Sequence, residues 1–129
     1  MKILIGFILS IILSTSCLAE ASNRIYTVQN LEVHYKEFQA SKDKYQALDS
    51  LFKMNNAVLD LMEFLPAPLN QLQENDPKVI EYQHVMGKLL TEINEIKKLF
   101  IAGKFVEGKK ATKDMNKLMT IVHKKYRQK

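Results

Sequence analysis

Histidines are the residues of this chain best suited to chemistry. His123 lies four residues after Met119 and three before Tyr126. At about 100° per residue it therefore falls at the edge of the apolar face of a predicted C-terminal helix. A neutral imidazole there could ligate a metal ion or a haem iron. From the residues alone, a partly buried histidine hydrogen-bonded to a neighbour is the favoured interpretation, and ligation is the alternative.

A second histidine raises the question of a di-iron centre. Glu81 and His84 lie one helical turn apart, which is half of the pattern that such centres use in helical bundles. The other half is missing, because Thr120 stands three residues before His123. The sequence therefore argues against a di-iron site, and we expect the remaining histidine, His34, at an interface or in solvent.

Other catalytic groups are not apparent in this sequence. None of the four glycines has the spacing of a phosphate-binding loop, and no Ser-His-acid arrangement can be recognised. We therefore predict no enzymatic activity. Methionines 54, 62, 86, 115 and 119 lie at or near predicted core positions, where methionine more often fills gaps than binds a metal.

The first 21 residues are typical of a secretory signal peptide. Lys2 precedes an apolar run of about 11 residues, too short for a bilayer core that takes roughly 20. Ala19 and Ala21 match the small-x-small pattern of a cleavage site. We predict cleavage after Ala21, export to the periplasm and one mature domain, residues 22–129. A lipoprotein modified at Cys17 is the less favoured alternative, since Leu13 lies one position too far from that cysteine.

Cys17 is the only cysteine and precedes the predicted cleavage site. The mature chain therefore has no disulfide, no thiolate metal site and no covalent haem attachment. Packing alone must hold the fold, with or without a bound cofactor.

Apolar residues recur at helical spacing along nearly all of the mature chain, with no strand-like alternation. Four stripes are predicted: Val28, Leu31, Tyr35 and Phe38; Leu48, Leu51, Phe52, Val58, Leu59 and Met62; Tyr82, Met86, Leu89, Ile93, Ile96 and Phe100; and Phe105, Met115, Leu118, Met119, Val122 and Tyr126. They predict four helices of roughly 18–25 residues. Because the connections are short, we expect an all-α, antiparallel up-down-up-down four-helix bundle.

Local signals mark where these helices begin and end. Asp43 and Gln46 form a predicted capping box after a break at residues 41–44. Two prolines within residues 65–68 end the second helix, and a polar linker follows. Asp76-Pro77 is a strong helix start.

The third helix should stop at Gly103, because glycine is the preferred residue just beyond a helix C-terminus. Lys104 then begins the last helix almost at once.

Charge is distributed unevenly. Residues 22–96 carry seven Lys/Arg and eleven Asp/Glu, which gives a net charge of −4. Residues 97–129 carry eleven Lys/Arg and two Asp/Glu, which gives a net charge of +9. A basic helix beside acidic neighbours in one bundle is the favoured explanation. An acidic partner is the alternative, and export argues against nucleic acid.

The mature chain resembles the soluble cytochrome b562 family over about 108 residues without an evident gap. The resemblance is strongest at residues 51–69, at Asp76-Pro77 with Tyr82 and His84, at residues 102–104, and at the C-terminal run from His123 to Arg127. Ser22 also falls where the mature chains of that family begin.

This resemblance implies one non-covalent b-type haem near one end of the bundle. A methionine on the first helix and a histidine on the last helix ligate its iron. The histidine corresponds to His123, and ligation thereby becomes its favoured role. The implied pocket lining is Leu31, Met54, Pro66, Tyr82, Met86 and Met119, with Arg127 as a partner for the haem carboxylates.

The chain departs from the family at three positions. Val28 stands where the family has its ligating methionine, Met86 replaces an aromatic residue of the third helix, and Met119 replaces an arginine. Val28 cannot donate to iron, so the resemblance implies a five-coordinate or water-ligated haem. Met86 is the one methionine with a conceivable approach from the other side.

We therefore predict a periplasmic b-type haem protein that carries single electrons or stores haem. We expect a monomer with a redox partner of acidic character, without nucleic acid and without stable membrane insertion after cleavage. The alternative is a haem-free bundle that serves as a periplasmic binding or stress-related adaptor, with its basic last helix as the contact surface.

Overall fold

A computed structural model describes residues 28–127 of the chain. The predicted signal peptide, its cleavage site and the start of the mature domain fall outside these residues. The described chain forms α2 (Val28–Ala40), α3 (Lys44–Glu63), α4 (Pro77–Ile101) and α5 (Phe105–Tyr126). All regular structure within residues 28–127 is helical, so the predicted all-α class is confirmed.

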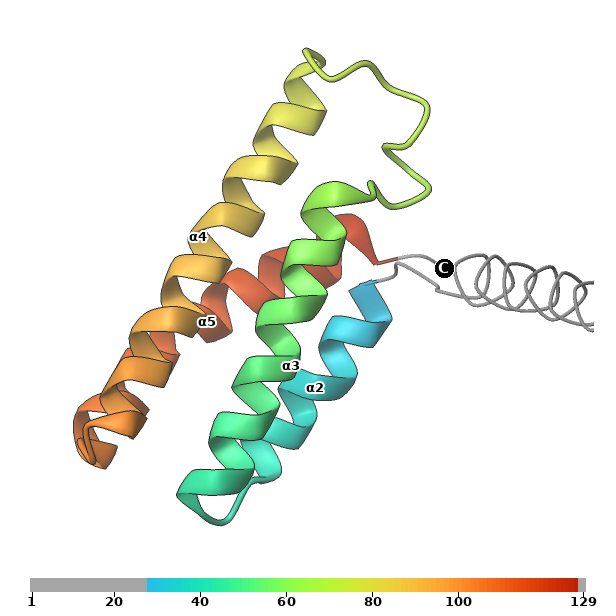
Figure 1. The fold of residues 1–129 in the computed structure, drawn as a ribbon. Helices are drawn as coiled ribbons and strands as arrows, with labels where there is room; N and C mark the ends of the chain where they lie inside the picture. Colours follow the sequence, from blue (N-terminus) through green and yellow to red (C-terminus); the bar gives the residue numbers. More distant parts are fainter. Residues whose placement is uncertain (1–27, 128–129) are drawn as a thin grey trace, which may run out of the picture.

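The four helices form an antiparallel bundle in which neighbours along the chain pack side by side (Figure 1). α2 packs on α3, α3 on α4 and α4 on α5, while α2 and α5 touch far more sparsely. Short turns at residues 41–43 and 102–104 lie at one end of the bundle, and the linker at residues 64–76 lies at the other. The predicted up-down-up-down order is confirmed, with the side between α2 and α5 the least closely packed.

Caps begin α3 as its sequence predicts. The Asp43 carboxylate accepts a hydrogen bond from the Gln46 backbone N–H at 2.9 Å. The Gln46 side chain reaches back, but it accepts from the Lys42 backbone N–H at 3.0 Å, one residue before the usual position. The Asp43 cap is thus formed as predicted, whereas the reciprocal bond differs from that of a standard capping box, in which the N-cap N–H is the donor.

The predicted boundaries of α4 are also confirmed. Asp76 caps the helix by accepting from the Lys78 backbone N–H at 2.9 Å, and Pro77 is the first helical residue. At the other end Gly103 has φ +77°, and the Gly103 and Lys104 N–H groups donate to the carbonyls of Phe100 and Leu99. Such a left-handed residue favours glycine, which has no Cβ to clash with the backbone.

Most of the predicted stripes form the core. The first and third stripes are buried throughout except for the partly buried Tyr35. Three predictions are wrong: Phe52, Leu59 and Phe105 are 55%, 45% and 43% exposed. Phe52 and Leu59 directly follow the buried Leu51 and Val58, and a step of about 100° turns them out of the core.

None of the helices within residues 28–127 combines the length and apolar character that crossing a bilayer requires.

Candidate functional site

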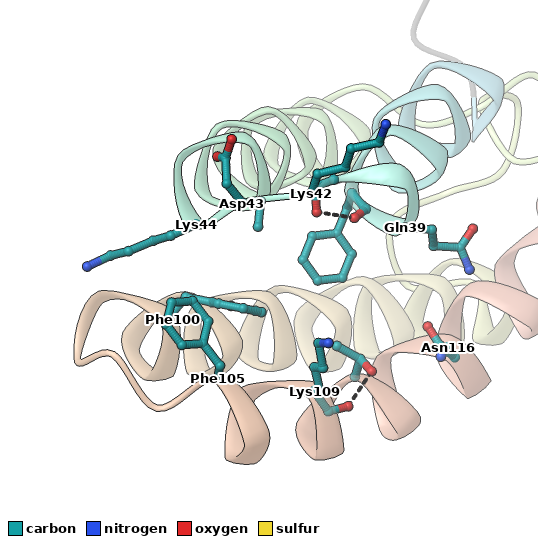
Figure 2. A pocket seen from close by; sticks show the side chains of 12 residues that line it. Gln39, Lys42, Asp43, Lys44, Phe100, Phe105, Lys109 and Asn116 are labelled. Carbon is teal, nitrogen blue, oxygen red and sulfur yellow. Dashed lines mark hydrogen bonds between the residues drawn. The ribbon is translucent and has the colours of Figure 1, made fainter.

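Two hollows are described on the sparsely packed side of the bundle, and the larger one contains none of the predicted site residues. It has a volume of about 540 Å³ and lies at the end with the two short turns. Phe38, Phe100 and Phe105 line it beside three lysines, two of which, Lys42 and Lys44, extend away from it (Figure 2). It contains no histidine and no methionine, so it offers no ligand for a haem iron.

A hydrogen bond between α2 and α5 lies between the two hollows. The Tyr35 hydroxyl donates to Asn116 Oδ1 at 2.5 Å. Partial burial raises the pKa of Tyr35 above its usual value. Asn116 lines the larger hollow, whereas Tyr35 lines the smaller one.

The smaller hollow, called the α2/α5 groove here, brings three of the predicted site residues together. It has a volume of about 320 Å³. Its walls come from two helices: Glu32, Tyr35, Lys36 and Gln39 on α2, and Met119, Thr120, His123 and Lys124 on α5, with Arg127 just beyond. His123, Met119 and Arg127 were expected at a haem site, and they are neighbours in this groove.

His123 is oriented by a carboxylate from the opposite wall. Its Nδ1 lies 2.7 Å from Glu32 Oε1, and its side chain is 51% exposed. Since Nδ1–H donates to the carboxylate, Nε2 is the nitrogen left free to accept or to bind a metal ion. A histidine that ligates a metal usually donates its other N–H in the same way.

Glu32 is the carboxylate that ties the two walls together. Its side chain is only 12% exposed, and its second oxygen Oε2 lies 3.4 Å from Arg127 Nε. A carboxylate with so little access to water needs compensating partners, which His123 and Arg127 provide from α5. The result is a three-residue polar cluster that joins α2 to the C-terminal end of α5.

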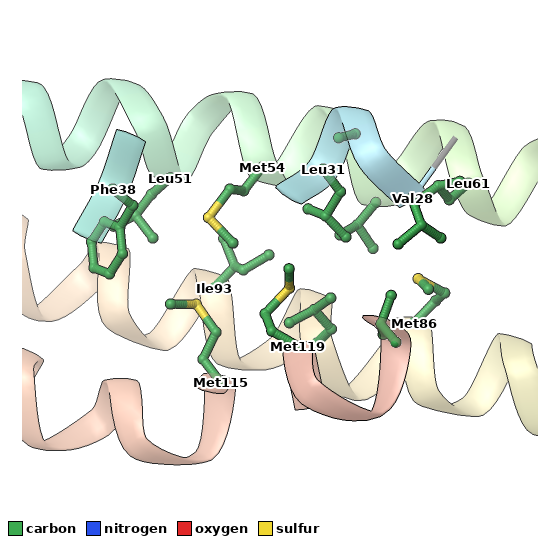
Figure 3. Packing of buried hydrophobic residues seen from close by; sticks show 14 of the residues in the cluster. Val28, Leu31, Phe38, Leu51, Met54, Leu61, Met86, Ile93, Met115 and Met119 are labelled. Atoms are coloured by element: carbon green, nitrogen blue, oxygen red, sulfur yellow. The ribbon is translucent and has the colours of Figure 1, made fainter. Parts of the chain in front are cut away.

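The remaining predicted site residues are buried in the core or in the linker after α3, and they do not line the groove. Leu31, Met54, Tyr82 and Met86 are completely inaccessible, and Pro66 is also buried. Leu31, Met54, Met86 and Met119 belong to one continuous cluster of apolar side chains (Figure 3). The structure thus divides the predicted lining into an open groove and a close-packed wall.

Tyr82 holds the wall in place at the end of the bundle that contains His123. Its hydroxyl donates to the Leu61 carbonyl at 2.9 Å, which satisfies an acceptor in the last turn of α3. Its ring meets that of Tyr126 edge to face at 4.9 Å. Burial, and to a smaller degree Tyr126, raises the pKa of Tyr82 far above its usual value.

At Val28, the position where a second iron ligand was sought, α2 offers no donor. Val28 is completely buried and carries only an alkyl side chain. In Figure 3 Met86 lies at the same end of the core as Val28 and extends toward it from another helix. Met86 is therefore the thioether to consider near Val28, although it comes from α4 and not from α2.

The other histidines do not join the groove. His34 Nδ1 lies 3.3 Å from Glu37 Oε2. His84 is exposed. Glu81 does not pair with His84 but with Lys125, whose Nζ lies 2.6 Å from Glu81 Oε1. This hydrogen bond and the negative charge of the carboxylate raise the pKa of Lys125. Across residues 28–127 no three His, Cys, Asp or Glu side chains are grouped closely enough to hold a metal ion.

Sequence reasoning missed Glu32, the residue that orients His123. One signal was available: Glu32 lies four residues after Val28 and three before Tyr35, so it must share the edge of their helix face. Lys36 and Lys124, which border the groove, carried no signal that distinguished them from other exposed lysines.

Comparisons with known proteins agree with this architecture. The family description of cytochrome b562 matches residues 27–127. Two proteins of Yersinia pestis are similar to this chain. One, described as probable soluble cytochrome b562 2, is 29% identical over 126 residues, which is 98% of both chains. The other, probable soluble cytochrome b562 1, is 29% identical over 119 residues, which is 90% of this chain and 91% of the relative.

Proposed function

The chain belongs to the cytochrome b562 family, and from this membership we propose that it binds one non-covalent b-type haem at the α2/α5 groove. His123 is the iron ligand in this proposal. Haem supplies one-electron chemistry when it is bound, while the protein provides burial, orientation and charge. The protein would then serve as an electron carrier or a haem reservoir.

The observation that carries the proposal is the contact between His123 and Glu32. At 2.7 Å the carboxylate fixes the imidazole with Nδ1 as the donor and leaves Nε2 for the iron. The same hydrogen bond would also suit a purely structural histidine. Membership in the cytochrome b562 family supports ligation as the role of His123, because the resemblance makes this histidine the counterpart of the family ligand.

The residues around the groove suit a haem in polarity. The buried wall of Leu31, Met86 and Met119 is apolar, as the ring system of a haem requires. The carboxylates of the haem would lie near three cations. These are Arg127 at the C-terminal end of the groove, Lys36 on its α2 rim and Lys124 on its α5 rim. These lysines compensate for the arginine that Met119 replaces.

The groove is small for this task, and the fold provides a way to enlarge it. Its volume of about 320 Å³ is near the lower end of ligand sites, roughly 300–1,000 Å³. α2 and α5 have the sparsest contact in the bundle. Since little packing has to be broken there, this is the side on which the helices can separate to admit a flat ligand.

The position of Val28 affects what the bound iron can do. Without a donor at Val28 of α2, His123 would hold the iron, and a second ligand would have to come from water or from Met86. Loss of the thioether lowers the reduction potential relative to a His/Met site. We also propose export to the periplasm, which residues 1–21 support by their signal-peptide pattern.

A haem titration of the purified protein tests the proposal. We expect a saturable one-to-one shift of the Soret band that is lost in His123→Ala and retained in His84→Ala. His84 is a matched control, because it is an exposed histidine outside the groove. Equal binding by both variants would refute His123 as the ligand. No binding by the natural chain would leave a haem-free bundle that acts as a binding or adaptor protein.

A further inference from the structure

The outer face of α5 carries a row of lysines that the haem proposal does not use. Lys109, Lys110, Lys113, Lys117 and Lys124 are all exposed. At about 100° per residue they fall within an arc of about 100°, opposite the buried face of the helix. The row, called the α5 lysine row here, is about 22 Å long at 1.5 Å per residue.

The five lysines of the row are not paired with carboxylates in the part of the chain that the structure describes. None of them takes part in an ion pair there, whereas Lys53, Lys98, Lys104 and Lys125 each do. Like charges so close together repel one another unless something neutralises them. The row is therefore a surface whose charge is not balanced inside the molecule.

The acids of α5 do not interrupt the row. Glu107 and Asp114 are the only carboxylates of the helix. Both fall about 40–60° beyond the arc, on the side that faces α4. Glu107 approaches Lys104 at 3.9 Å. Asp114 lines a hollow with Lys117 of the row and with Lys88 and Glu92 of α4, but no ion pair joins Asp114 to Lys117. The charged residues within the outward arc are thus all cations, although the exposed Val106 and Thr120 also lie in it.

One end of the row reaches the α2/α5 groove. Lys124 belongs both to the row and to the lining of the groove, one residue after His123. A molecule that rests on the row therefore lies beside the groove. We propose that the α5 lysine row is the docking surface for an acidic protein. The further statement that this partner exchanges electrons rests on the proposed haem function.

The surface suits a protein better than a lipid bilayer or a nucleic acid. Helices that lie on membranes insert an apolar face, whereas the apolar face of α5 is buried in the core. Proteins that bind single strands stack bases on aromatic side chains, and no aromatic residue lies in the lysine arc. Carboxylates on a folded protein need only complementary charge over a comparable length.

Two variants of equal net charge test the surface. The first replaces Lys109, Lys110, Lys113 and Lys117 by Gln and leaves the groove intact. The second replaces four lysines spread over the rest of the molecule by Gln: Lys42, Lys53, Lys78 and Lys97. Lysine and glutamine have similar helix propensities, and circular dichroism checks that both variants fold.

The probe is a fluorescent polyglutamate peptide of about 30 residues, measured by anisotropy with haem-free and haem-treated protein. With each exposed contact worth about a factor of two, we expect the row variant to bind about tenfold more weakly at low salt, and the dispersed variant less than about threefold. The difference should vanish near 0.5 M salt, where screening acts within a few ångströms. Because peptide binding is also measured with the haem-free protein, the test of the lysine row remains valid if the protein does not bind haem.

Equal losses in the two variants would overturn the proposal, because net charge alone would then explain binding. Binding of both variants to vesicles rich in phosphatidylglycerol and to a DNA duplex of about 20 base pairs is measured for comparison. Row-dependent binding to either of them that is tighter than binding to the peptide would assign the surface to a membrane or to nucleic acid, and would equally overturn it.

Discussion

The substitution Val28→Met should give the haem iron the ligand that α2 now lacks. By its resemblance to the family, Val28 corresponds to the ligating methionine, and it is completely buried at the end of the bundle that contains His123. We expect the haem complex of this variant to become six-coordinate and low-spin, with sharp bands in the reduced state. Its reduction potential should rise, because a thioether favours reduced iron.

The haem-free variant should be less stable than the natural chain. Methionine is longer than valine, and Val28 has no accessible surface. Overpacking of a closed core costs about 1–3 kcal/mol. The lower half of this range applies because the adjacent core contains the flexible Met86. For a domain of about 100 residues, 1 kcal/mol lowers the Tm by about 4–8 °C.

Haem should reverse this loss in the variant. A ligand at about 100 times its Kd stabilises the folded state by about 2.7 kcal/mol, more than the expected overpacking at the lower end. The assay is thermal unfolding with and without haem, combined with visible spectra in both oxidation states. Val28→Leu is the matched control, since it enlarges the same side chain without adding a donor.

Two results would refute this reasoning. If Val28→Leu produced the same low-spin spectrum as Val28→Met, the spectrum would report packing and not ligation. If Val28→Met bound haem but stayed five-coordinate, position 28 would not face the iron, and the register of α2 assumed from the family would be wrong.

Three further predictions follow from the site and from the fold. Glu32→Gln should weaken haem binding about 10–100-fold, because it loosens the candidate iron ligand, whereas Glu37→Gln, which lies outside the groove, should have little effect in the same titration. Burial raises the pKa of Tyr82, so its contribution to stability is complete below about pH 10 and is lost as pH rises through the folded-state pKa. Tyr82→Phe should therefore lose less stability between about pH 10 and 12 in urea unfolding, while being about 1 kcal/mol less stable at pH 7 for want of its hydrogen bond. Gly103→Ala should destabilise the protein by about 1–2 kcal/mol because φ is +77°, whereas Gly87→Ala, in mid-helix with nothing within 4 Å of the added Cβ, should stabilise it by about 0.5–1 kcal/mol.

Each of these predictions has an outcome that contradicts it. Equal haem affinities for the Glu32 and Glu37 variants would remove Glu32 from the site. Parallel pH profiles for Tyr82→Phe and the natural chain would mean that Tyr82 is not the group that titrates. A stabilising Gly103→Ala would show that the turn at residues 102–104 does not need a left-handed residue.

The sequence was sufficient to predict the helices and their ends, because these depend on neighbours a few residues apart. Asp43 and Gln46, Asp76 and Pro77, and Gly103 act within one turn of their own helix. The buried stripes follow for the same reason, since a period of 3.6 residues determines which side chains share a face. The stripe predictions failed at Phe52, Leu59 and Phe105, where apolar character alone does not say which neighbouring face is covered.

The haem assignment also came from the sequence, through family resemblance and not through any local motif. His123 could be named as the candidate ligand because the register of the whole mature chain places it there. The same register exposed Val28 as a departure. Neither statement required knowledge of what surrounds these two side chains.

Only the tertiary structure revealed the partner of His123. Glu32 lies 91 positions away in the chain, yet its carboxylate is 2.7 Å from the imidazole. Helical periodicity gives each side chain a direction about its own axis, but not the identity of the helix it meets. That identity depends on how the two hairpins close against each other, and it leaves α2 and α5 as the loosest pair, with the groove between them.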